Sequence, residues 1–105
     1  MGCNYMKKFL VILKDPNYEA PFTPEQIAAL TRGHVEHIRD LDARGILFLC
    51  GPLKGSERGM LILSARSYED ALSHVMQDPF VVNECYKAYE INEIAQANKG
   101  NNYLG

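Results

Sequence analysis

The stretch GILFLCGPLKGSERGMLILS, residues 45–64, decides the fold predicted for this chain. It contains two short runs of apolar residues, separated by a turn that holds glycine, proline and charged residues. Short apolar runs bounded by glycine and proline are typical of buried β-strands. We therefore predict two consecutive strands, over residues 46–50 and 60–64, in the middle of the chain.

A helix is predicted on each side of these two strands. Thr23 can cap the first helix and Gln26 can bond back to it, while Gly45 ends the helical pattern. Apolar residues recur at the three- and four-residue spacing of an amphipathic helix; they are Ile27, Leu30, Ile38 and Leu41. Ser67 caps the second helix. The predicted buried stripe of that helix consists of Tyr68, Ala71, Leu72, Val75 and Met76.

Two further strands, over residues 6–13 and 85–94, complete the order βαββαβ. This is the ferredoxin-like arrangement, an α+β fold with a four-stranded antiparallel sheet and two helices on one face. A length of 105 residues suits one domain, 1–105, whose core we place at about residues 5–95. The start of the chain, with Cys3, is expected to be flexible. Residues 96–105 form a polar tail that should fray unless a partner holds it.

The composition of the strands predicts a second copy of the chain. The runs 9–13, 46–50 and 60–63 are apolar at every position, and such strands are expected to be buried on both faces. Because both helices cover the same face of the sheet, the other face would expose a large apolar patch to water. We therefore predict a homodimer in which two sheets pack through the faces opposite the helices.

The overall composition excludes several classes of partner. Eleven basic and thirteen acidic residues give a net charge of −2, so no strongly basic face is available for nucleic acid. No apolar run approaches the roughly 18 residues that span a bilayer. The three cysteines are odd in number and scattered, which argues against a disulfide framework and for a reducing compartment. We expect a cytoplasmic protein without nucleic-acid or membrane partners.

His34 lies in the middle of the apolar stripe of the first helix. A histidine on a buried face needs a partner for each ring nitrogen, so it is either a satisfied core residue or a functional one. Asp78 is the candidate to hold it, although an aspartate before a proline is also a natural N-cap. The two roles can coexist, because one carboxylate oxygen can cap while the other orients an imidazole. Sequence spacing does not show whether the two side chains meet.

The other polar motifs have a structural interpretation. His34 and His37 could bind a metal, but no third or fourth ligand is specified, so no metal site is predicted. His74 lies off the apolar stripe of its helix and is expected to be solvated. The turn at Gly51 and Pro52 lacks the ending of a phosphate loop and is interpreted as a strand exit.

Aromatic and thiol side chains of the strands are expected to be packing residues. Phe80, Tyr86 and Tyr89 could line a pocket, although aromatic residues in strands usually pack against their neighbours. Cys50 and Cys85 fall in predicted strands, where a buried thiol behaves as a small inert hydrophobe.

The segment Gly33-His34-Val35-Glu36-His37-Ile38, together with Gly51-Pro52-Leu53 and Asp78-Pro79-Phe80, resembles the YciI-like (YCII-related) family. The resemblance implies a dimeric ferredoxin-like α+β barrel and a cleft with a His-Asp dyad, whose members match His34 and Asp78. We also expect substrate contacts from Gly51, Pro52 and Phe80. The chain departs from the family pattern in its long first loop, its extra N-terminal residues and its polar tail.

Three functions remain open at this level. The first is a cofactor-independent small-molecule enzyme of the isomerase or lyase (dehydrochlorinase) type, in which His34 is the general acid–base and Asp78 fixes its tautomer. The second is a non-catalytic dimeric module that binds a metabolite or a protein, with a structural His-Asp pair. The third, a haem- or metal-dependent monooxygenase, has only the His34/His37 spacing in its favour. An open cavity beside the imidazole would favour the enzyme, whereas a sealed ring would favour the module.

Overall fold

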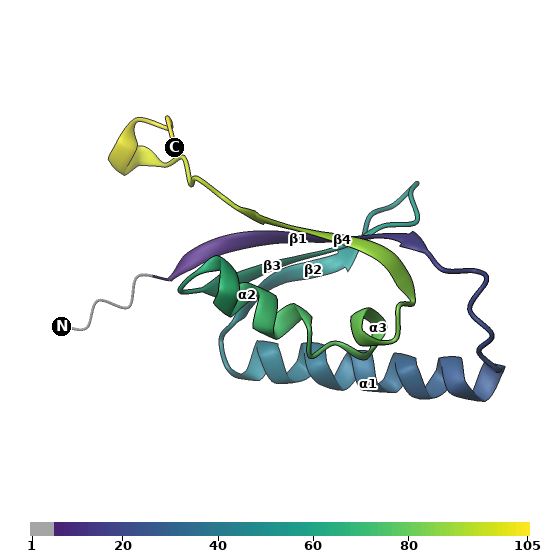
Figure 1. Cartoon of the computed structure of the whole chain (residues 1–105). Helices are drawn as coiled ribbons and strands as arrows, with labels where there is room; N and C mark the ends of the chain where they lie inside the picture. Colours follow the sequence, from purple (N-terminus) through teal and green to yellow (C-terminus); the bar gives the residue numbers. More distant parts are fainter. Residues whose placement is uncertain (1–5) are drawn as a thin grey trace.

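The computed structural model describes residues 6–105, in which four antiparallel strands form one sheet with the order β2-β3-β1-β4. The strands are β1 Lys7–Pro16, β2 Leu47–Pro52, β3 Gly59–Ala65 and β4 Tyr86–Glu93. The helices are α1 Pro24–Ala43, α2 Tyr68–Val75, the short α3 Pro79–Val82 and a 3-10 turn, η1, Lys99–Asn101. The predicted ferredoxin-like α+β fold is confirmed, and α1, α2 and α3 all lie on one face of the sheet (Figure 1).

Local signals place α1. The Thr23 hydroxyl accepts from the Gln26 backbone N–H at 3.1 Å, and the Gln26 side chain accepts from the Thr23 N–H at 2.8 Å. These reciprocal bonds satisfy two of the donors that every helix start leaves free. At the other end, Gly45 adopts a left-handed φ of 73°, which a residue without a Cβ adopts at little cost, and the chain then turns into β2.

The core lies between the sheet and the helices. On β1 and β3, alternate residues point to the helix side and are buried; they are Phe9, Val11, Leu13, Leu61, Leu63 and Ala65. Leu41 from α1 and Val75 from α2 close this layer. Each large apolar side chain buried in this way contributes about 1.5–3 kcal/mol to folding. This layer sets the separation between α1 and the strands.

The opposite face of the sheet is open in the single chain. The register pairs Leu10 with Ile62 and Ile12 with Met60, and all four side chains are only half-buried. On the same side, the Lys8 ammonium bonds to Ser64 and lies over the ring of Phe48, which is 67% exposed. The apolar surface that motivated the dimer prediction therefore exists, on the side that no helix covers.

The predicted buried stripe of α2 is confirmed for Ala71 and Val75 but is wrong at its two ends and for His74. His74 was expected to be solvated, but it is only 7% exposed, whereas Tyr68 and Met76 are 47% and 45% exposed. Ala71, His74 and Val75 have the three- and four-residue spacing of one helix face, and together they form the buried face of α2. Tyr68 and Met76 lie at the two ends of the helix and point away from the sheet layer.

Both ends of the chain were expected to be flexible. In the tail, the Asn98 side chain accepts from the Gly100 N–H at 2.8 Å and the Asn101 side chain accepts from the Asn98 N–H at 2.9 Å, and these bonds form the 3-10 turn η1; fraying of the tail stays a prediction. The prediction of a flexible start, with Cys3, concerns residues outside those that the structure describes.

The burial of His74 predicts a pH dependence of stability. Burial lowers the pKa of His74 below its ordinary 6.5, partly offset by the Asp70 carboxylate; Arg44, His37 and Arg66 lower it further. The unfolded chain therefore binds a proton on this residue more readily, and the free energy of unfolding falls as the pH drops below about 6.5. The pKa of Asp70 is also lowered, from 3.8, chiefly by its bond from the Arg66 backbone, so its contribution is lost only in stronger acid.

We expect His74→Leu to flatten this dependence, because leucine fills the site without binding a proton. Between pH 7 and pH 5 the midpoint of thermal unfolding should fall by a few degrees more for the wild type than for the variant. Circular dichroism at a series of pH values measures both slopes. Equal slopes would show that His74 does not carry the effect.

Candidate functional site

Close packing of α1 against α3 brings His34 to Asp78. At Gly33, an added Cβ would lie 2.9 Å from Cγ of Pro79, nearer than real Cβ atoms come to another heavy atom. The absence of a side chain at Gly33 thus lets the Pro79 ring approach the helix. Asp78 directly precedes that ring, and its carboxylate is thereby placed beside the imidazole one residue along α1.

Gly33→Ala is expected to disturb this arrangement. Alanine favours a helix interior over glycine by about 1 kcal/mol, but overpacking against the rigid Pro79 ring costs about 1–3 kcal/mol. The net result should be a modest loss of stability together with a changed His34 imidazole resonance. Arg32→Ala, at an exposed position one residue earlier on α1, is the matched control for thermal unfolding and histidine NMR. An unchanged imidazole resonance and a more stable protein would contradict this role for Gly33.

The imidazole and the carboxylate form a bonded pair. His34 Nδ1 lies 2.8 Å from Oδ2 and 3.0 Å from Oδ1 of Asp78, and the Asp78 side chain is only 4% exposed. Since an ionised carboxylate only accepts hydrogen bonds, Nδ1 carries the proton and Nε2 is the free nitrogen of the neutral ring. Asp78 Oδ1 also accepts from the Phe80 N–H at 2.9 Å and so caps α3. One carboxylate therefore serves both roles.

One face of the imidazole packs against an aromatic ring. Phe80 stacks on His34 with ring centroids 4.2 Å apart and an interplanar angle of 11°. The Phe80 ring in turn meets Tyr86 edge-on, at 6.3 Å between centroids. The imidazole is held in one orientation by the carboxylate on its edge and by the phenyl ring on its face.

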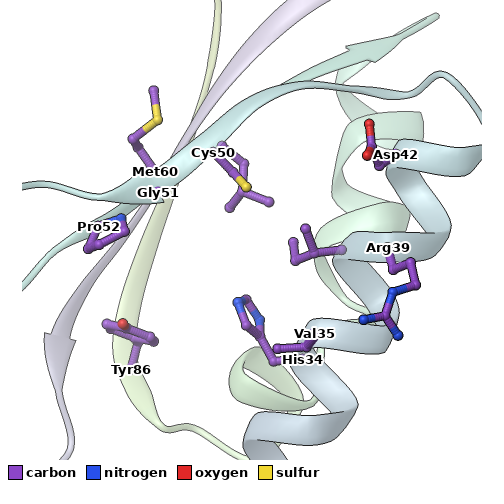
Figure 2. A pocket seen from close by; sticks show the side chains of 12 residues that line it. His34, Val35, Arg39, Asp42, Cys50, Gly51, Pro52, Met60 and Tyr86 are labelled. Atoms are coloured by element: carbon purple, nitrogen blue, oxygen red, sulfur yellow. The ribbon is translucent and has the colours of Figure 1, made fainter.

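A cavity of about 460 Å³ opens in front of His34. Figure 2 shows the imidazole rising from α1 toward the strand that carries Cys50 and Pro52, with Tyr86 across the space. The cavity is bounded by α1 on one side and by three strands on the other; its residues are His34, Val35, Ile38, Arg39, Asp42, Cys50, Gly51, Pro52, Gly59, Met60, Leu61 and Tyr86. Among the expected substrate contacts, Gly51 and Pro52 thus line this cavity, whereas Phe80 stands behind the imidazole.

The sequence alone did not place Cys50 or Tyr86 at this cavity. Cys50 was expected to be buried and inert, but it is exposed and lines the cavity, because β2 lies at the edge of the sheet. Tyr86 was left open as a pocket-lining or a packing residue. It lines the cavity, and its hydroxyl lies 3.9 Å from where a Cβ of Gly59 would be, an ordinary contact distance. A tyrosine two strands away from a glycine gives no sequence signal of this kind.

The electrostatics of Tyr86 suit a hydrogen-bond donor. Burial, and secondarily the Asp78 carboxylate and the Cys85 thiol, raise the pKa of the Tyr86 phenol above its ordinary 10. The phenol therefore keeps its proton throughout the neutral range. It can donate that proton in a hydrogen bond to an oxygen of a molecule in the cavity.

Within residues 6–105, no three His, Cys, Asp or Glu side chains gather closely enough to hold a metal ion. His37 lies on α1 but does not line the His34 cavity. None of the helices in the same range is both long and apolar enough to cross a membrane.

Comparison with known proteins gives a family and a fold. A family model described as the YCII-related domain matches residues 6–95. A comparison with curated proteins gave no match. Among solved structures, the chain is similar to 5-chloro-2-hydroxyhydroquinone dehydrochlorinase from Burkholderia phenoliruptrix, in complex with 2,5-dihydroxybenzoquinone. The two are 22% identical with a TM-score of 0.66, over 90% of this chain and 98% of that one, which shows a shared fold.

Proposed function

The chain belongs to the YCII-related domain family, and from this premise we propose that it is a small-molecule enzyme in which His34 transfers protons as general acid and base. The observation that carries the proposal is an imidazole held on one nitrogen by Asp78 while it lines a cavity of about 460 Å³. A structural histidine would be sealed by its aliphatic neighbours, whereas the His34 side chain is 24% exposed. This contrast favours catalysis over a binding module with a structural pair.

The arrangement supports reactions that begin with removal of a carbon-bound proton. Nε2 of His34 takes the proton, and the negative charge of Asp78 stabilises the imidazolium that forms. The electrons left on the substrate become an enolate, whose oxygen the Tyr86 hydroxyl stabilises by donating a hydrogen bond. Return of the proton to another carbon is an isomerisation, and departure of a leaving group with its bonding electrons is an elimination.

We propose a planar, hydroxylated ring compound as the substrate class. The similar dehydrochlorinase is named for a chlorinated hydroxyhydroquinone and holds 2,5-dihydroxybenzoquinone. The cavity beside His34 is lined by Gly51 and Pro52 and holds one phenol donor, Tyr86, which suits a ring with oxygen substituents. Free thiols at Cys50 and Cys85 support a reducing compartment, and we place the protein in the cytoplasm.

The proposal is tested with 2,5-dihydroxybenzoquinone as a probe, because proton transfer can be followed without the natural substrate. In deuterated buffer, His34 acting as acid should deliver a deuteron to a ring carbon of the probe, and acting as base it should then remove the original proton from that carbon. The protein should therefore accelerate exchange of the ring C–H protons above the rate in buffer alone, measured by ¹H NMR. Binding of the probe without any acceleration would contradict the acid–base role and favour the metabolite-binding module.

We also propose that two chains pair through the open sheet face. Phe48 and Leu49, 67% and 53% exposed, extend the half-buried apolar patch of β1 and β3 on that side. Exposed apolar side chains that form one continuous patch are normally covered by another surface.

Phe48→Glu is therefore expected to convert a dimer into a monomer, since burying a carboxylate between two apolar faces is costly even when the Lys8 ammonium lies near it. Val82→Glu places the same charge on an exposed position of the helix layer and should leave the dimer intact. Sedimentation at micromolar concentration distinguishes the two states. A monomeric wild type would refute the dimer.

A further inference from the structure

A second cavity, of about 300 Å³, lies beside Phe80, the residue whose ring stacks on His34. Its walls come from the loop between β1 and α1, the first half of α1 and the start of β4; the residues are Pro16, Asn17, Tyr18, Ala20, Phe22, Ile27, Leu30, Thr31, Phe80, Cys85 and Tyr86. None of these side chains carries a charge at neutral pH. Tyr86 lines both cavities, so the two adjoin each other at the Tyr86 ring.

The second cavity exists because α1 extends beyond the sheet (Figure 1). Leu41, near the C-terminal end of the apolar stripe, is 1% exposed, whereas Ile27, near its beginning, is 52% exposed. The expectation that the whole stripe faces the sheet therefore holds only for its second half. The first half presents apolar surface that no strand covers, and covering such surface is favourable.

The loop over the second cavity is fixed by bonds to other parts of the chain. The Asn17 backbone N–H donates to the Cys85 carbonyl at 2.8 Å, and the Asn17 amide donates to the Glu84 carbonyl at 3.1 Å. The Tyr18 hydroxyl donates to Glu57 in the β2–β3 turn. A wall held at several points is preformed, so a ligand does not have to order it.

We infer that the second cavity binds an apolar, planar substituent of the same molecule whose hydroxylated ring lies against His34. The inference rests on the proposed function and narrows its substrate class to ring compounds that carry an aromatic or alkyl group. The uncharged walls exclude a charged substituent, and the edges of Phe80 and Tyr86 suit contact with a flat ring. The long first loop, in which this chain departs from the family pattern, supplies the outer wall.

Binding of a matched pair of probes tests the inference. The pair is 2,5-dihydroxybenzoquinone and its 3-phenyl derivative, with dissociation constants measured by isothermal titration calorimetry. We expect the wild type to prefer the phenyl compound by about tenfold or more, the scale of discrimination that an apolar pocket provides. A preference below about threefold, or no binding of either probe, would overturn the inference.

Variants locate the preference in the second cavity. Ala20→Phe fills the cavity from the loop and should bring the ratio of the two dissociation constants close to one. Leu30→Ala removes apolar contact from the helix side without blocking the space and should lower it severalfold. Ala29→Phe adds the same ring at an exposed position of α1 that does not line the cavity and should keep the full preference.

Two outcomes would contradict the assignment to a ligand. The preference could survive both Ala20→Phe and Leu30→Ala, or these changes could alter the number of subunits in sedimentation, which would make the groove a contact between copies. The proposed function is judged separately, by proton exchange in His34 variants. Loss of the preference for the phenyl compound with proton exchange intact would overturn the second-cavity inference alone. Loss of proton exchange with the preference intact would overturn the proposed function alone.

Discussion

Replacing His34 by glutamine is expected to remove the protein's acceleration of ring-proton exchange in 2,5-dihydroxybenzoquinone, by a factor of about 10²–10⁴. Glutamine keeps much of the imidazole's volume and can still donate a hydrogen bond to Asp78, but it does not accept a proton at neutral pH. The exchange rate in deuterated buffer, followed by ¹H NMR, measures the loss. A His34→Gln protein that exchanges the probe as fast as the wild type would show that this residue is not the acid–base group.

The matched control for this change is His37→Gln. His37 lies three residues further along α1, is half-buried and does not line the cavity in front of His34. The His37→Gln variant should therefore exchange the ring protons of the probe at the wild-type rate. Stability separates the two interpretations of His34: a merely structural imidazole would cost about 1–3 kcal/mol on replacement, because Asp78 would lose its partner. A catalytic imidazole can be replaced at a smaller cost.

Asp78→Asn is expected to have the second largest effect, a loss of exchange of about 10²-fold or more at nearly unchanged stability. Asparagine caps helices as well as aspartate does, so the bond from the Phe80 N–H to the capping oxygen persists. The variant nevertheless lacks the negative charge that stabilises the imidazolium. Exchange rates and thermal unfolding, measured on the same samples, check both parts.

The comparison with Asp78→Ala isolates the capping role. Alanine removes the cap as well as the charge and should lower the free energy of unfolding by a further amount of about 1 kcal/mol. If Asp78→Asn kept the full exchange rate, the charge would have no part in the chemistry. If it unfolded as easily as Asp78→Ala, the carboxylate would be a structural group first.

The element order was predictable because its signals are local. The Thr23–Gln26 box, the left-handed Gly45 and the apolar runs of β2 and β3 each depend on residues within a few positions of one another. By contrast, the contact between His34 and Asp78 joins residues 44 positions apart and depends on how closely Pro79 approaches Gly33. Spacing alone did not specify that contact; the family resemblance suggested the pair, and the packing shows their geometry.

Features that depend on how elements are oriented were not predictable. His74 is buried because it shares one face of α2 with Ala71 and Val75, and the apolar pattern of α2 did not mark a histidine as part of that face. Cys50 is exposed because β2 lies at the sheet edge beside the cavity. The second cavity depends on where α1 passes the end of the sheet, which the periodicity of its stripe does not encode.

The central claim is that Asp78 holds the proton on Nδ1 of His34 and thereby leaves Nε2 free toward the cavity. Long-range ¹H–¹⁵N correlation spectra of the histidine rings test it directly. We expect the Nδ1–H form for the neutral His34 ring, with an Nε2 resonance that shifts when 2,5-dihydroxybenzoquinone is added. An Nε2–H form in the wild type would contradict this claim. So would an Nε2 resonance that does not shift when the protein is saturated with the probe.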